Sequence, residues 1–139
     1  MGLDMYLEAR DKGGNVWEAA YWRKANQVHN WFVENVQEGV DDCGAYEVTI
    51  DELQHLIDLC SKAKDIMDAS SRDESADGEY DGEVVEKLNE LLPTTSGFFF
   101  GTTEYDEWYY SQIEDTINQL EKVKENHEDG VTYKYCSSW

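Results

Sequence analysis

Both ends of the chain carry the two-residue alternation of a half-buried β-strand. Apolar and polar side chains alternate through residues 2–10 and again through 131–136. The apolar set is Leu3, Met5, Leu7, Val131, Tyr133 and Tyr135. Side chains two residues apart share one face of a strand. Because a lone strand would expose unpaired backbone groups, we expect both terminal strands to belong to one sheet.

Four stretches between these strands show the helical spacing of apolar residues, at about 17–37, 50–67, 84–92 and 104–126. Thr49 with Glu52 has the capping-box spacing and should open the second helix, directly after a short strand at Tyr46 to Val48. We therefore predict one α+β domain over residues 1–139. About four helices should pack on a small, mostly antiparallel sheet that includes both terminal strands.

The connecting segments are rich in turn residues. Residues 12–15 read Lys-Gly-Gly-Asn and 41–44 read Asp-Asp-Cys-Gly, and both favour turns. The paired aspartates lack the alternating acids and distal Glu of a calcium loop, so a turn or a helix cap is favoured over a metal site. Residues 68–83 consist mostly of Ser, Asp, Glu, Gly and Ala, which predicts a mobile acidic loop.

The chain is strongly acidic, with 11 Lys and Arg against 31 Asp and Glu and a formal net charge of -20. Nucleic-acid backbones and anionic membranes would be repelled, so we expect neither as a direct partner. Three cysteines without a CxxC spacing indicate neither a disulfide framework nor a zinc site. No stretch approaches the length of a membrane span. These features favour a cytoplasmic protein with no metal or cofactor.

Residues Ser96 to Tyr110, SGFFFGTTEYDEWYY, are the most aromatic part of the chain. Three adjacent phenylalanines lie between two glycines, and such rings strongly favour burial. Thr103 follows as a predicted helix N-cap, with Asp106 in capping-box spacing. One interpretation is a buried strand and helix start without a functional role. The other is a ligand site, because Thr103, Glu104 and Tyr105 would meet at a helix N-terminus beside aromatic rings.

The predicted helix 17–37 has two faces. One row of apolar residues predicts core packing: Trp17, Tyr21, Ala25, Val28, Phe32 and Val36. The second row, Trp22, Asn26, His29 and Val33, is expected to lie off that core stripe. Arg23 and Lys24, two of the few basic residues, are adjacent. They could simply pair with nearby carboxylates, or they could hold an anionic ligand.

We predict a ligand site that joins this helix to the aromatic stretch. Its residues are Trp22, Arg23, Lys24, Asn26, His29, Phe100, Thr103, Glu104 and Tyr105. Flat rings stack on aromatic side chains, and cations with helix N-terminal N–H groups receive phosphate. The pattern thus favours a small anionic, nucleotide-like ligand.

Four blocks of the sequence together resemble a family of small uncharacterised proteins of bacteriophages and bacteria. They are MGLDMYL (Met1 to Leu7), YWRKANQVHNWF (Tyr21 to Phe32), DDCG (Asp41 to Gly44) and LLPTTSGFFFGTTEYDEWYY (Leu91 to Tyr110). The resemblance implies a phage or prophage accessory protein, acting in the host cytoplasm to counter host defence.

Two other function classes remain open. The net charge and the acidic 68–83 segment favour an inhibitor that binds the basic nucleic-acid-binding surface of a host protein. An enzyme using Glu104, Asp106 or His29 as acid or base is less favoured, because no second catalytic partner stands at a definite spacing. The chain has neither a GxxxxGK[ST] loop nor a GxGxxG turn, which argues against a kinase or dehydrogenase.

Overall fold

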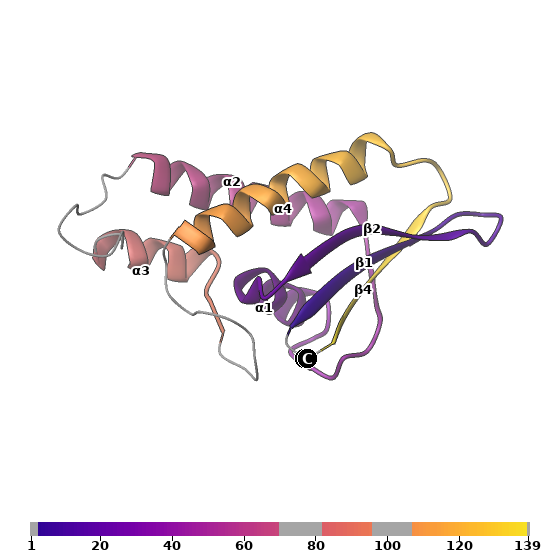
Figure 1. Cartoon of the computed structure of the whole chain (residues 1–139), viewed down its shortest axis with the longest axis horizontal. Coiled ribbons are helices and arrows are strands. Elements are labelled where there is room, and N and C mark those ends of the chain that lie inside the picture. The colour runs from indigo at the N-terminus through magenta and orange to yellow at the C-terminus, as the bar shows by residue number, and fades with distance from the viewer. Residues whose placement is uncertain (1–2, 70–81, 96–106, 139) are drawn as a thin grey trace.

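The computed structural model describes residues 3–69, 82–95 and 107–138. In these residues the elements are β1 (Asp4–Arg10), β2 (Val16–Arg23), α1 (Asn26–Asn35), β3 (Tyr46–Val48), α2 (Ile50–Ala69), α3 (Gly82–Leu91), α4 (Glu107–Glu125) and β4 (Thr132–Ser138). This part of the chain is an α+β fold with four helices and one four-stranded antiparallel sheet (Figure 1). The predicted fold class is confirmed.

The sheet has the strand order β2-β1-β4-β3, so the first and last strands of the chain are its two central members. β1 and β4 pair antiparallel along their whole lengths, from Asp4 opposite Ser138 to Arg10 opposite Thr132. The predicted pairing of the terminal strands is therefore confirmed. Its cause is the one given by the sequence pattern, since two half-buried strands satisfy each other's backbone groups.

One face of the sheet is buried and the other is polar. Met5, Leu7 and Ala9 of β1 are buried beside Tyr133 and Tyr135 of β4, because the registers place them on the same face. Helices α2 and α4 run side by side and α4 contacts β2, while α3 packs against α2 away from the strands (Figure 1). The core therefore lies between the helices and the sheet.

The prediction of a helix over 17–37 is wrong for its first third. Residues Val16–Arg23 form β2, which pairs antiparallel with β1, and the helix α1 begins only at Asn26. The Asp11 side chain accepts hydrogen bonds from the backbone of Gly13 and Asn15, at 2.9 Å each, and so closes a hairpin. Once this turn forms, pairing with β1 overrides the helix-like spacing of the aromatic residues in β2.

The outer edge of β2 is covered by a side chain of α4. The Gln119 amide accepts a hydrogen bond from Tyr21 N at 2.9 Å and donates one to Tyr21 O at 2.8 Å. It thus takes the place of a neighbouring strand at this residue. Such cover protects an edge strand from pairing with another chain.

The remaining boundaries differ from the predicted ones only at their ends. Thr49 and Glu52 form the predicted capping box, with Glu52 N donating to Thr49 Oγ1 at 3.1 Å and Thr49 N to Glu52 Oε1 at 3.1 Å. The acidic loop predicted over 68–83 is wrong at both ends, because 68–69 belong to α2 and 82–83 to α3. Residues 70–81 of that loop lie outside the described residues. None of the described helices is long and apolar enough to cross a membrane.

Candidate functional site

The junction between β2 and α1 brings two basic residues to a helix start. Lys24 has a positive φ of 55°, which turns the chain sharply from the strand into the helix. Its backbone is fixed on both sides, because Lys24 N donates to Leu3 O at 2.8 Å and Gln112 Nε2 of α4 donates to Lys24 O at 3.2 Å. Arg23 and Lys24 therefore stand on a rigid corner immediately before α1.

The N-terminus of α1 carries no capping side chain. Its N-cap residue is Ala25, and the first turn contains no acidic residue. The first intrahelical bonds run from Val28 N and His29 N to Ala25 O, so the N–H groups of Asn26 and Gln27 precede the bonded ladder. A helix start of this kind, next to two cations, favours a negative charge.

Arg23 lies on the polar face of the sheet and is open to solvent. Its side chain is 58% exposed and forms a 3.8 Å ion pair with Asp4, to which Tyr21 also donates from its hydroxyl at 2.5 Å. That hydrogen bond to Asp4 is the main cause that raises the pKa of Tyr21. Because exposed ion pairs contribute about 0–1 kcal/mol, Asp4 does not prevent Arg23 from binding an anion.

Polar side chains of α1 hold the chain on both sides of residues 96–106. Asn26 Oδ1 accepts a hydrogen bond from Thr95 N at 3.1 Å, and Asn30 Nδ2 donates to Pro93 O at 3.4 Å. On the other side, Gln27 Nε2 donates to Tyr109 O at 3.4 Å. The chain on both sides of residues 96–106 is thus attached to the first half of α1.

Trp22 is part of the core, on the opposite face of β2 from Arg23. Its indole Nε1 donates to Thr116 Oγ1 at 2.9 Å, and Thr116 in turn donates to the backbone oxygen of Gln112 at 2.7 Å. Neighbouring residues of a strand point to opposite faces, so Trp22 and Arg23 cannot contact the same small ligand. Trp22 joins the sheet to α4 instead.

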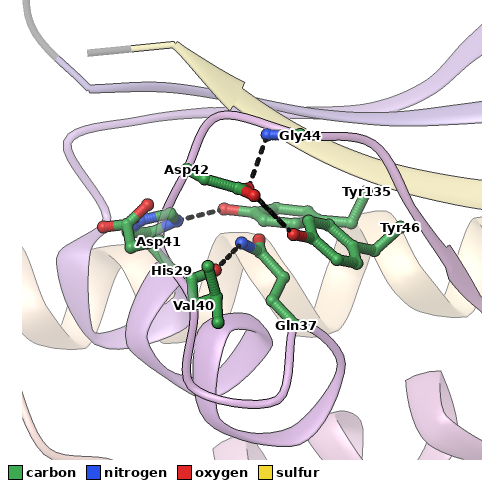
Figure 2. A network of polar contacts seen from close by, with 8 residues as sticks. All are labelled: His29, Gln37, Val40, Asp41, Asp42, Gly44, Tyr46 and Tyr135. Carbon is green, nitrogen blue, oxygen red and sulfur yellow. Dashed lines mark hydrogen bonds and ion pairs between the residues drawn. The ribbon is translucent and has the colours of Figure 1, made fainter.

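His29 is fully buried at the centre of a carboxylate–imidazole–phenol network (Figure 2). Its Nδ1 lies 2.6 Å from the Tyr135 hydroxyl and its Nε2 lies 3.0 Å from Asp41 Oδ2. Burial, and then the negative charge of Asp41, raise the pKa of Tyr135 well above 10, so the phenol stays protonated. The Asp41 carboxylate can only accept a hydrogen bond, so Nε2–H donates to it and Nδ1 is left to accept from the phenol. We accordingly assign the imidazole proton to Nε2, which donates to Asp41.

The turn after α1 is built by the second aspartate of the pair. Asp42 Oδ1 accepts from Gly44 N at 3.0 Å, and its carboxylate accepts from the Tyr46 hydroxyl at 2.8 Å (Figure 2). The bond from Tyr46 is the main cause that lowers the pKa of Asp42. The predicted turn is confirmed. Among the described residues no group of three or more His, Cys, Asp and Glu side chains could hold a metal ion.

The structure places the predicted site residues in three groups. The expectation that the second row lies off the core is wrong, because the structure buries Trp22, Asn26 and His29. Trp22 is buried because alternate residues of strand β2 face the core. Asn26 and His29 are buried because they lie on the inward face of α1. Arg23 is exposed and Lys24 is half-buried at the start of α1. The other predicted residues lie outside the described residues: Phe100, Thr103, Glu104 and Tyr105.

Three residues of this region were missed by the sequence reasoning. Gln27 and Asn30 carry no signal of their own, because their partners are backbone groups about 60 to 80 positions away. The sequence pattern predicts only a turn or cap role for Asp41, although its place shortly after α1 allows it to reach back to His29. Comparison with protein-family models, curated proteins and solved structures returned no significant match for this chain.

Proposed function

We propose that this protein is a small binding module that takes an anionic, nucleotide-like ligand at the start of α1. The observation that carries the proposal is the position of Arg23 and Lys24 directly before a helix start without cap or acidic residue. The same helix start binds the chain on both sides of residues 96–106 through Asn26 and Gln27. Cations, helix N–H groups and stacking rings are the groups that bind nucleotides.

The distribution of acids supports a site for an anion at this helix in particular. α2 has Asp51 and Glu52 in its first turn, α3 has Glu83 and α4 has Glu107. α1 alone among these four described helices has none. Because the net charge of -20 repels an anion at long range, the local cations must supply the attraction. The affinity should therefore depend strongly on Arg23 and Lys24.

The biological role that we propose follows from the resemblance to phage and bacterial accessory proteins. Such a protein would act in the host cytoplasm and sequester a nucleotide signal of host defence. Sequestration requires binding without turnover, and the burial of His29 agrees with this, since a buried imidazole held by Asp41 and Tyr135 cannot approach a substrate.

Calorimetric titration with a panel of cyclic and linear nucleotides tests the proposal. We expect at least one nucleotide to bind saturably, and the double variant Arg23→Ala/Lys24→Ala to weaken that binding by at least about 100-fold, from two lost charge-assisted contacts. The matched control is Arg10→Ala, an exposed arginine at the opposite end of β1. Absence of binding across the panel, or equal losses in both variants, would reject the site.

A second candidate function is supported by the charge of the two long helices. α2 carries five carboxylates against two lysines, and α4 carries the same numbers. Together these helices could bind the basic nucleic-acid-binding surface of a host protein. The test is capture of a nucleic-acid-binding protein from host lysate, released both by salt and by competing DNA. Capture that neither salt nor DNA affects would exclude this function.

A further inference from the structure

The outer edge of strand β2 is covered near its end and open in its first half. Backbone N–H and C=O groups of an antiparallel strand point alternately toward and away from its neighbour. Tyr21, Glu18 and Val16 lie opposite every second residue of β1, so the backbone groups of all three point in the same direction. Those of Tyr21 point outward, because Gln119 binds them. In the part of the chain that the structure describes, no hydrogen bond reaches the outward groups of Val16 or Glu18.

A groove of about 280 Å³ lies between this open half of the edge and the end of α4. Residues 17–19 of β2 line it together with Lys122 and Val123 of α4, Asn126 after the helix, and Tyr133 of β4. An extended peptide can add a strand to an exposed sheet edge, with main-chain hydrogen bonds for affinity and pockets for alternate side chains for specificity. The edge of β2 offers the first and the groove offers the second.

Trp17 is the open end of a buried row of side chains. The registers align Trp17, Ala9, Tyr133 and Val48 across the sheet. The last three are at most 4% exposed, whereas Trp17 is 44% exposed and its neighbour Val16 is 46% exposed. An apolar side chain of an added strand, placed opposite Trp17, would continue this row and remove the indole from water.

The other face of the sheet sets the charge of an added strand. There the registers align Glu18, Glu8, Lys134 and Glu47, so Glu18 at the outer end lies next to the like charge of Glu8. Cross-strand pairs of opposite charge stabilise a sheet and like pairs destabilise it, which favours a lysine or arginine opposite Glu18. Lys122 lines the groove, where a second cation would be repelled. The net charge of -20 also attracts a basic partner at long range.

The occupant that fits is a segment of another protein rather than a second copy of this chain. Two copies would each bring a net charge of -20 to the interface and repel one another. Gln119 also blocks the edge at Tyr21, so two eight-residue β2 strands cannot pair along their whole lengths. The open stretch around Trp17 instead matches a short extended segment.

We propose that the open edge of β2 binds an extended, basic segment of a partner protein as an added antiparallel strand. Read from its N-terminus, the segment places a basic residue opposite Glu18, an apolar residue opposite Trp17 at the groove, and a second apolar residue opposite Val16. Its backbone exchanges hydrogen bonds with Glu18 and Val16. The inference does not depend on the anion site at the start of α1, since it uses none of the residues of that site.

The test is a titration of the ¹⁵N-labelled full chain with the capped peptide acetyl-Thr-Lys-Val-Val-Thr-amide, followed by proton–nitrogen correlation spectra. The matched control peptide carries N-methyl groups on the lysine and on the second valine, the residues opposite Glu18 and Val16. We expect the amide signals of Glu18 and Val16 to shift saturably, and that of Trp17, which points toward β1, to shift less. The N-methylated peptide should bind at least about tenfold more weakly, from the loss of two hydrogen bonds.

A charge exchange at Glu18 completes the test. Glu18→Lys should weaken binding of the lysine peptide by about fivefold and strengthen binding of the same peptide with Glu in place of Lys. Glu47→Lys makes the same change on the same face of the other edge strand, β3, and should leave both peptides unaffected.

The proposal is overturned by amide signals of Glu18 and Val16 that no peptide moves, by equal binding of the N-methylated peptide, or by equal binding to Glu18→Lys and wild type. Shifts of these two signals that appear with protein concentration alone would also overturn it, and would assign the edge to a second copy of the chain.

Discussion

Tyr135→Phe gives the sharpest test of the buried network around His29. The substitution removes the hydroxyl that donates to Nδ1 at 2.6 Å and keeps the ring that stacks on Phe32, with 3.8 Å between ring centroids. Loss of a hydrogen bond between buried groups costs about 1–3 kcal/mol. We therefore expect the variant to be less stable than wild type by this amount at pH 8.

The same variant should change how stability depends on alkaline pH. Burial, followed by the charge of Asp41, raises the pKa of the Tyr135 phenol well above 10 in the folded state. The unfolded phenol ionises near pH 10, so its contribution is complete below that pH and is lost as pH rises above it. At pH 11 the loss for one such tyrosine is about 1.4 kcal/mol. The Tyr135→Phe variant has no phenol at this position, so it does not lose this stability at high pH.

Denaturant melts of both proteins at pH 8, 9, 10 and 11, at constant ionic strength, measure the difference. The gap between wild type and Tyr135→Phe should stay constant from pH 8 to 9 and narrow by about 1.4 kcal/mol at pH 11. Other groups with raised pKa values, Cys60 among them, affect both proteins equally and cancel in the comparison. A gap that does not change with pH would show that the phenol is not shielded in the folded state, and would refute the network.

Three further predictions concern the core, the sheet edge and the cysteines. Phe32→Ala should lose about 3–5 kcal/mol in denaturant melts, because Phe32 is fully buried; a loss below about 0.5 kcal/mol would show that this is not a core position. Gln119→Ala should cost about 1–2 kcal/mol through two lost hydrogen bonds to Tyr21, and it should promote self-association in sedimentation; an equally stable monomer would contradict the role of this side chain. A thiol reagent should modify exposed Cys43 promptly and native Cys60 only on unfolding, since burial raises the pKa of Cys60 to about 12; equal rates would rule this out.

Local patterns allowed a large part of the fold to be predicted. The alternation in the two terminal strands led to their pairing, because a strand with one apolar face has few ways to bury it. Thr49 and Glu52 could be read as a helix start from two residues alone. Both features depend on short-range physics, and the structure confirms both.

The strand β2 was missed because Trp17 and Tyr21, four positions apart, also fit a helix. The error changed the predicted site as well. On a helix, Trp22 and Arg23 lie about 100° apart and can share a face. In a strand they point to opposite faces, one into the core and one into solvent. The hairpin signal at residues 12–15, followed by an aromatic segment, could have corrected both conclusions.

The buried polar contacts could not have been predicted from the sequence. Tyr135 is 106 positions from His29, and Thr116 is 94 positions from Trp22. Which of these distant polar groups form hydrogen bonds with each other depends on the complete fold. Arg23 is exposed and forms an ion pair with Asp4, which is the carboxylate pairing that the sequence left open beside an anionic ligand.

The central claim is that Arg23 and Lys24 hold an anionic nucleotide at the start of α1. The most direct measurement is the nucleotide retained by protein purified from host cells, released by denaturation and quantified by mass spectrometry. Wild type and Arg10→Ala should carry the same nucleotide in near-stoichiometric amount. Arg23→Ala/Lys24→Ala should carry almost none while remaining folded, because Arg23 is exposed, Lys24 is half-buried and neither belongs to the buried core. Equal nucleotide in all three proteins, or none in wild type, would contradict the claim.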